Sequence, residues 1–399
     1  MGRSRSRVVK ALFFSLPLHG HIIPTLPLVR ELADRGERIV YYSTPTFAAK
    51  IEQAGAEYRP YRNAFLQELQ QLPERMEELS GLLMTATAEL LRGELDGWRA
   101  ERPDYLITDS VAAWGQWSAK LLRVPVVTSV PTLAVNRHVL RYAFQHGVRP
   151  KSASRFLSKL RYMVKASLLR RQLIRRHGVS GPGIMGLVSG NSGLNIVYGS
   201  RHFQPCAETF DERFLFIGPN SDPRGASIPF PWELVTHPVV VYVSLGTLFN
   251  ADADFYRKCY EAFRGEDYQV VLSSPNDRSP APPNFIVQAH VPQIEVLRRA
   301  AAFVSHGGMN SVNESLSHGV PMLVIPQMGE QMIIGRRVEE LGAGLYLEKA
   351  EVTADKLREG VRCLLADRRF REQAARVRQS FQTAGGVVRA ADAIRAFTR

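Results

Sequence analysis

The chain has 399 residues, 45% of them hydrophobic, and a formal net charge of +13 at pH 7. This length exceeds that of one typical domain, so we expect two domains, each with a full hydrophobic core. No apolar stretch approaches the length needed to span a membrane, which excludes an integral membrane protein of the helical class.

Cysteine usage and the first residues bear on the compartment. Cys206, Cys259 and Cys363 are far apart and lack the spacing of a metal or redox motif. The basic first residues run straight into a strand pattern without the apolar segment of a signal peptide. We therefore expect buried thiols in a reducing compartment and a cytoplasmic protein.

Strands and helices alternate along the first half of the chain. The expected strands are 8–16, 38–44, 105–108, 124–129, 194–198 and 214–217, and the expected helices are 24–35, 47–55, 82–98 and 112–122. A proline at the start and a glycine just past the end frame the first of these helices. The alternation predicts a parallel α/β domain.

A second alternating pattern follows a stretch rich in Pro, Gly, Ser and Asp. Its expected strands are 239–245, 269–273, 285–287, 301–305 and 322–325, and its last helices are 353–366, 369–383 and 387–397. The predicted fold class is therefore α/β, with two facing Rossmann-like doubly wound domains. We place the first domain at 1–217, the linker at 218–238, the second domain at 239–384 and a C-terminal helix at 385–399.

The positive charge is concentrated in one region. Residues 110–207 contain no Asp or Glu, and residues 151–177 alternate basic and apolar side chains at helical spacing. A solvated outer face is the commonest explanation of such a basic amphipathic helix. Two functional alternatives are more specific. One is a weak peripheral contact with an anionic membrane, at the inner membrane face, and the other is an acidic acceptor. Nucleic acid is disfavoured, because the chain shows no recognition motif.

Residues 303–331 contain a strand, a glycine turn and the start of a helix. An apolar run ends at His306, Gly307 and Gly308 form the turn, and a helical pattern opens at Met309. Free N–H groups at a helix N-terminus, together with the macrodipole, favour an anion. Glycine at the turn lets a phosphate approach the backbone closely. This segment is typical of a nucleotide diphosphate site.

Polar side chains in the first turns of this helix extend the pattern. Glu314 lies three to four residues beyond Asn310 and Ser311, on the same helix face. A carboxylate there suits the two hydroxyls of a ribose beside the phosphates. An ordinary strand–turn–helix, in which the glycines serve only the turn, is the alternative. It leaves these polar residues and His306 unexplained.

Residues 290–331 resemble the nucleotide-sugar signature of the UDP-glycosyltransferases, especially the bacterial macrolide-type branch. The matching residues are Val291, Pro292, Gln293, His306, Gly307, Gly308, Asn310, Ser311, Glu314, Gly319, Val320, Pro321, Pro326, Glu330 and Gln331. The resemblance implies the GT-B architecture, in which the last helix crosses back to the first domain. It also implies a UDP-sugar as the donor substrate.

The resemblance assigns donor-binding roles to individual positions. It implies Thr247, His306, Asn310 and Ser311 at the diphosphate, Gln293 and Glu314 at the ribose, and Glu330 and Gln331 at the sugar. Ser244 and Gly246, at the end of the first strand of the second domain, and Gly308, in the glycine turn, are expected beside the same diphosphate, and His290 and Val291 complete the donor-binding residues. His290 is a departure, because many relatives carry a tryptophan there that stacks on uracil. An imidazole offers less stacking area, which bears on selectivity for uridine.

Two histidines and one aspartate follow strands of the first domain. His19 and His21 come just after strand 8–16, and Asp109 ends strand 105–108. Carboxyl ends of parallel strands are where open α/β sheets bind ligands. A His–Asp pair suits deprotonation of a hydroxyl, although a loop histidine and a helix-capping aspartate are the structural alternative. The resemblance implies His21 as the base and Asp109 as its partner, with His19 lining the site.

We expect no metal and no other cofactor. Asp252 and Asp254 match the metal-binding Asp-x-Asp motif of another glycosyltransferase fold. Here they stand at the start of a helix, where acidic side chains interact favourably with the helix dipole.

These features together predict an inverting, metal-independent transferase that moves a sugar, with glucose favoured, from a UDP-sugar to a hydroxyl of a small apolar acceptor such as a macrolide or polyphenol. Its acceptor pocket is expected in segments 63–81 and 131–149. A membrane-associated lipid glycosyltransferase is the enzyme alternative. A nucleotide-sugar-binding protein without turnover is the alternative of another class. The sequence carries no prediction of oligomeric state.

Overall fold

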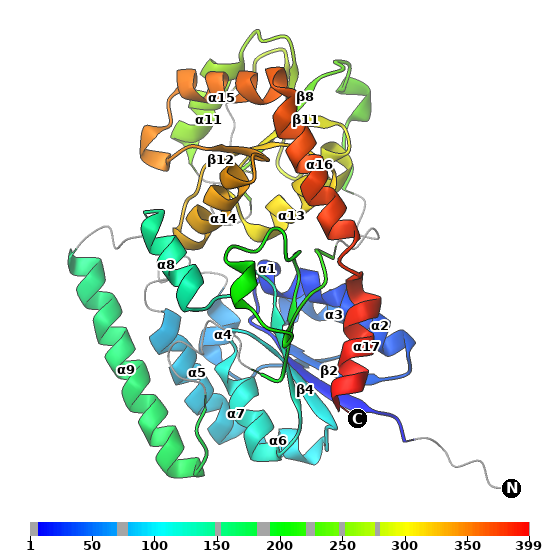
Figure 1. Cartoon of the computed structure of the whole chain (residues 1–399), viewed down its shortest axis with the longest axis vertical. Helices are drawn as coiled ribbons and strands as arrows, with labels where there is room; N and C mark the ends of the chain where they lie inside the picture. The colour runs from blue at the N-terminus through cyan, green and yellow to red at the C-terminus, as the bar shows by residue number, and fades with distance from the viewer. Residues whose placement is uncertain are drawn as a thin grey trace, which may run out of the picture.

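The structure is a computed structural model that describes residues 7–69, 79–147, 153–181, 192–220, 228–246, 252–275 and 280–398. It contains two parallel β-sheets with helices packed around each of them (Figure 1). The predicted fold class, two doubly wound α/β units, is confirmed. The exact domain boundaries and the linker at 218–238 stay predictions.

The first sheet has seven parallel strands in the order β3-β2-β1-β4-β5-β6-β7. Their bounds are β1 Lys10–Phe14, β2 Arg38–Ser43, β3 Glu57–Pro60, β4 Tyr105–Asp109, β5 Val126–Val130, β6 Leu194–Val197 and β7 Phe214–Phe216. The central strands are buried along nearly their whole length, as expected of a parallel sheet covered on both faces. The sequence did not predict β3, a half-buried edge strand without an apolar run.

Helices α1 to α9 accompany this sheet. Their bounds are α1 His19–Ile22, α2 Leu26–Asp34, α3 Ala48–Gln53, α4 Ala64–Glu68, α5 Leu79–Gly93, α6 Leu95–Ala100, α7 Ala113–Leu122, α8 Arg137–Gln145 and α9 Ala153–His177. Four predicted helices and the basic amphipathic helix are present. The expected helix 24–35 begins with a 3₁₀ turn (Ile23–Thr25) before α2, and the expected helix 82–98 is divided between α5 and α6. Helices α1, α4 and α8 were not predicted.

The second sheet has six parallel strands in the order β10-β9-β8-β11-β12-β13. Their bounds are β8 Val240–Ser244, β9 Gln269–Ser273, β10 Phe285–Gln288, β11 Ala300–Ser305, β12 Met322–Val324 and β13 Gly344–Tyr346. The helices of this half of the chain are α11 Ala253–Phe263, α12 Gln293–Leu297, α13 Met309–Ser317, α14 Gly329–Glu340, α15 Ala354–Ala366, α16 Arg368–Gln382 and α17 Gly386–Thr398. Short 3₁₀ helices lie at Pro45–Phe47, Ala207–Thr209, Trp232–Leu234 and Lys349–Glu351.

The last helix, α17, packs against the first sheet's unit (Figure 1). Its buried residues Ala390, Ala391 and Ile394 belong to the same hydrophobic cluster as residues of α2. At the edge of this contact the Arg35 guanidinium donates to Oδ1 of Asp392 at 2.5 Å and to the carbonyl of Val388. The chain therefore ends beside the part in which it begins.

The thiols differ in exposure. Cys259 is buried in α11, whereas Cys206 is half-buried and Cys363 is exposed on α15. The expectation of buried thiols is therefore wrong for Cys363, which falls on the solvent side of its helix. All three are free thiols.

Candidate active site

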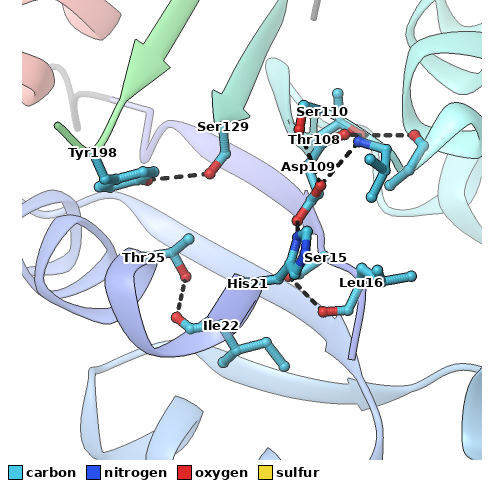
Figure 2. A network of polar contacts seen from close by, with 12 residues as sticks. Ser15, Leu16, His21, Ile22, Thr25, Thr108, Asp109, Ser110, Ser129 and Tyr198 are labelled. Carbon is cyan, nitrogen blue, oxygen red and sulfur yellow. Dashed lines mark hydrogen bonds and ion pairs between the residues drawn. The ribbon is translucent and has the colours of Figure 1, made fainter. Parts of the chain in front are cut away.

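The His–Asp pair predicted from the strand ends is formed. Strands β1 and β4 are neighbours, with Phe14 opposite Thr108, so the residues that follow them meet at one edge of the sheet. His21 in α1 places Nδ1 at 2.7 Å from Oδ2 of Asp109 (Figure 2). Since the carboxylate accepts the Nδ1 proton, Nε2 of the neutral ring is left as the basic nitrogen.

Asp109 is held as an oriented acceptor. Its side chain is 1% exposed, and its other oxygen, Oδ1, accepts the backbone N–H of Val111 at 2.9 Å and lies 3.5 Å from the Ser110 hydroxyl. Burial lowers the pKa of His21, but the charge and the hydrogen bond of Asp109, with a further contribution from Glu330, outweigh it and raise that pKa above its usual 6.5.

His19 lies in the same short helix but has other neighbours. Its ring packs edge-on against Phe47 at 4.9 Å between centroids. Burial and the nearby Lys50 charge lower its pKa. His19 thus has no carboxylate partner among the described residues, and the two histidines are clearly distinguished.

Glu330 is a residue of the second unit that lies near the His21–Asp109 pair. It stands at the start of α14, close enough to Thr132 of the first unit for that hydroxyl to affect the pKa of its carboxyl. Desolvation by the surrounding protein raises the pKa of Glu330, while the charge of His21 and the Thr132 hydroxyl oppose that rise. The carboxylate predicted at the sugar therefore lies near the predicted base, although the two residues come from different units.

The turn between β11 and α13 is built around the imidazole of His306. A Cβ on Gly308 would lie 2.4 Å from His306 Nε2, and a Cβ on Gly246 would lie 2.6 Å from its Cε1. Gly246 and Gly307 also have φ angles of +75° and +80°, which L side chains rarely adopt. Glycine is needed here for conformation and for the space that the ring occupies.

Burial lowers the pKa of His306 to about 4, so its ring is neutral at pH 7. Within the described residues its Nδ1 has no hydrogen-bond partner. A buried polar atom without a partner is costly, which fits a site completed by a ligand. The N-cap residue Gly308 offers no side chain to cap α13, so the N–H groups of its first turn face the same site.

The residues implied at the ribose are brought together. The Gln293 amide donates to Oε2 of Glu314 at 2.6 Å and lies 3.4 Å from the Ser311 hydroxyl. The Tyr242 hydroxyl donates to Oε1 of Gln293 at 3.1 Å, which fixes the orientation of the amide. Burial raises the pKa of Glu314, and the Gln293 bond opposes this.

The other predicted donor residues differ in their burial and contacts. Ser244 at the end of β8 accepts the Gly246 N–H at 3.2 Å, and Asn310 is half-buried in the first turn of α13. His290 is exposed, whereas Val291 beside it is buried. Thr247 lies outside the described residues.

Gln331 has a structural bond that the sequence did not predict. Its Oε1 accepts the backbone N–H groups of Gln327 at 2.8 Å and Met328 at 3.3 Å, which caps α14. Only its amide nitrogen is left for a ligand. Its role at the sugar stays a prediction.

The acidic pair at the start of α11 has structural partners. Asp252 caps the helix by accepting the Phe255 N–H at 3.1 Å, and Asp254 pairs with Arg257 and Lys258 at 2.6 and 2.7 Å. The predicted helix start is confirmed. Throughout the described part of the chain, no group of three or more His, Cys, Asp or Glu side chains is placed to hold a metal ion.

Two residues of the site were missed from the sequence. Tyr242 was detectable, because it precedes Ser244 by two positions and so shares its face of β8. Thr132 falls within segment 131–149, which the sequence predicts for the acceptor pocket, but only the packing of the two units places it near Glu330, so this proximity was missed.

Comparison with known proteins adds an independent observation. The profile described as "Erythromycin biosynthesis protein CIII-like, C-terminal domain" matches residues 266–385. The NDP-glycosyltransferase YjiC of Bacillus subtilis is 35% identical over 392 residues, which cover 96% of each chain. The demethyllactenocin mycarosyltransferase of Streptomyces fradiae is 32% identical over 97% of this chain and 86% of its own.

Solved structures agree with the sequence relatives. The calicheamicin glycosyltransferase CalG4 superimposes with a TM-score of 0.79 at 30% identity, covering 98% of both chains. The glycosyltransferase of kitacinnamycin gives 0.81 at 29% identity, covering 98% of this chain and 99% of its own. With a relative at this identity along nearly the whole length, the chain belongs to the UDP-glycosyltransferase family, in its bacterial macrolide-type branch, and is a glycosyltransferase of the GT-B fold.

Proposed function

We propose that the enzyme transfers a sugar, with glucose favoured, from a UDP-sugar to a hydroxyl of a small, largely apolar acceptor, with inversion at the anomeric carbon. The observation that carries this proposal is the 2.7 Å contact between His21 Nδ1 and buried Asp109. A base held in one tautomer and facing a donor site suits direct displacement by an acceptor oxygen.

In this mechanism Nε2 of His21 takes the proton of the acceptor hydroxyl as its oxygen attacks the anomeric carbon. Asp109 keeps the Nδ1 proton and stabilises the imidazolium that forms. The acceptor attacks from the face opposite the diphosphate, which gives inversion. Glu330, whose charge contributes to the raised pKa of His21, would bind hydroxyls of the sugar.

The leaving UDP is proposed to bind at the N-terminus of α13. Backbone N–H groups there, with an N–H of His306, stabilise the developing charge without a metal ion. A neutral His306 donates a hydrogen bond but carries no charge of its own in the free enzyme. A bound diphosphate would raise its pKa and favour the protonated form.

The choice of donor draws on the ribose site and on relatives. Gln293 and Glu314 offer an amide and a carboxylate to the two ribose hydroxyls. A protein of B. subtilis named as an uncharacterized UDP-glucosyltransferase, YojK, is 32% identical over 97% of each chain. These observations support UDP-glucose as the first donor to test.

The acceptor class is supported by the names of relatives, which refer to demethyllactenocin and calicheamicin. A lipid acceptor is the second candidate, because α9 presents apolar and basic side chains to solvent. No helix within the described residues combines the length and apolar content of a membrane span. A cytoplasmic location, expected from the sequence, stays part of the proposal.

The test is UDP release from UDP-glucose with a panel of hydroxylated acceptors, followed by NMR of the product's anomeric configuration. We expect acceptor-dependent release, a β-linked glucoside from the α-linked donor, and most of the rate retained in EDTA. Retention of configuration, or loss of activity in EDTA with recovery on adding a divalent ion, would contradict the mechanism. UDP binding without turnover on any acceptor would favour a binding protein.

A further inference from the structure

One face of helix α9 (Ala153–His177) packs into the core of the first unit. Ala166 is fully buried, Leu173 is 5% exposed, and both belong to the cluster that includes residues of α5. Tyr162 packs closely on Gly81 of α5, where an added Cβ would meet the ring at 2.6 Å. This face anchors the helix and leaves the opposite face turned outward.

The outward face is unexpectedly apolar. Leu160, Val164 and Leu168 recur every four residues, and they are 47%, 52% and 53% exposed. A helix face that is merely solvated would carry polar residues at such positions. Figure 1 shows α9 at the outer margin of the molecule. A row of half-exposed apolar side chains there marks an interaction surface.

Helix α8, which precedes α9 in the chain, repeats this pattern on a smaller scale. Leu140 and Phe144 lie one turn apart and are 39% and 57% exposed. The other side of α8 is buried through Val139 and Ala143. Exposed apolar side chains therefore occur on both α8 and α9.

Cations surround the apolar row on α9. The exposed basic residues from position 160 onward are Arg161, Lys165, Arg171, Arg175 and Arg176. Among the described residues, none of them has an ion-pair partner. The region between residues 110 and 207 contains no Asp or Glu that could serve as one. Arg170 is different, because its guanidinium donates to the carbonyl of Gly181.

We propose that this face of α9 docks on the surface of an anionic lipid bilayer. Half-exposed apolar side chains with flanking cations are the composition of an interfacial helix, which inserts shallowly while its basic residues bind anionic headgroups. A second copy of this chain would bring like charges together. Nucleic acid would leave the apolar row unexplained.

Docking would hold the enzyme at the membrane surface. Apolar acceptors partition into bilayers, so the enzyme would meet them there at high local concentration. That consequence rests on the proposed function, whereas docking itself does not, and vesicle binding is measured without any transfer assay.

The test is co-sedimentation of the full chain with vesicles of phosphatidylglycerol and phosphatidylcholine, and of phosphatidylcholine alone, at low and physiological salt. We expect binding to the anionic vesicles only, weaker at physiological salt because of screening. Arg161→Gln/Arg171→Gln/Arg175→Gln should weaken low-salt binding at least about tenfold. Leu160→Gln/Val164→Gln/Leu168→Gln should weaken it at both salt concentrations.

Matched controls remove the same chemistry elsewhere. Arg368→Gln/Arg371→Gln/Arg378→Gln removes three exposed arginines from α16, and Val388→Gln removes a side chain that is 53% exposed on α17. Both controls should bind like the parent, and circular dichroism should show every variant folded. No sedimentation with anionic vesicles, or equal sedimentation of the α9 variants and the controls, overturns the proposal. Equal binding to soluble polyglutamate by the parent and the apolar variant would instead indicate an acidic protein partner.

Discussion

His19 and His21 stand two positions apart in α1, yet only His21 contacts a carboxylate, at 2.7 Å from Asp109. His21→Ala should therefore fold normally, bind UDP and lose transfer by about two to four orders of magnitude, the range for removal of a general base. His19→Ala, the matched control, should lose much less. Steady-state kinetics with UDP affinity measured in parallel would check this. A larger loss of transfer in His19→Ala than in His21→Ala would contradict the assignment of His21 as the base.

The pH dependence of transfer should reflect the raised pKa of His21. Burial lowers this pKa, but Asp109 and Glu330 raise it by more, so the free enzyme should lose kcat/KM on the acid side with a midpoint above 6.5. In Asp109→Asn the rate should fall and the midpoint should move to lower pH. Measuring kcat/KM against pH for both enzymes decides this; an unmoved midpoint would assign the acid limb to another group.

The same shift has a consequence for stability with a defined sign. A raised folded-state pKa means that the protonated His21 is stabilised by its neighbours in the native structure. Its contribution to the free energy of unfolding is fully present below the ordinary pKa of about 6.5 and is lost as the pH rises through the raised value. Activity and this contribution to stability therefore change in opposite directions over one pH window.

The space around His306 gives a prediction about the donor. A methyl group on Gly308 would lie 2.4 Å from Nε2, so Gly308→Ala must displace the imidazole. We expect UDP affinity, measured by calorimetry, to fall at least about tenfold, the size of one charge-assisted hydrogen bond. Gly97→Ala on α6, with nothing within 4 Å of the new methyl group, is the control. Unchanged UDP affinity in Gly308→Ala would remove His306 from the diphosphate site.

At the scale of single elements, long periodic segments were predictable and short ones were not. Strand β8 has the sequence Val-Val-Tyr-Val-Ser and is wholly buried, so its apolar run predicts a strand. Strands β3 and β13 lie at sheet edges and are only partly buried, so they lack such a run. Helix α12 has five residues, too few to show a helical period.

Among the side chains at the ends of strands and helices, some roles were predictable from the sequence and others were not. Asp109 was predictable, because it ends a strand and the rule for parallel sheets says where such ends gather. The capping bonds of Gln331 were not, since they depend on how Gln327 and Met328 turn back before α14. Pattern reasoning locates the site, whereas local backbone geometry decides which atoms are already engaged.

At the scale of the whole molecule, contacts between the two units join residues far apart in the sequence. Asn313 donates to the carbonyl of Tyr198 at 3.2 Å, and the hydroxyls of Ser200 and Ser380 lie 2.8 Å apart. No periodicity encodes such pairs, because each depends on the docking of two surfaces formed separately. The same docking places Glu330 near His21, so the site is complete only when both units are in position.

Arg337 of α14 makes the most connected of these contacts. Its guanidinium donates to the carbonyls of Phe203 at 2.9 Å and His202 at 2.8 Å, and also to Glu340 at 2.7 Å. Glu340 in turn accepts the hydroxyl of Tyr142 from α8 at 3.0 Å. One side chain therefore connects the second unit to two segments of the first.

Arg337→Ala should lower the free energy of unfolding by about 1.5–3 kcal/mol, because it removes charged hydrogen bonds and leaves partly buried carbonyls unpaired. Urea denaturation at pH 7 would measure this, with two probes reporting the two units. We expect the probes to separate as docking weakens. The neighbouring Arg336 is the control, since it pairs with Glu339 at 2.8 Å and stacks on Tyr346, both within the second unit. Arg336→Ala should therefore leave the two probes coincident, and separation of the probes in that variant alone would show that Arg337 does not hold the units together.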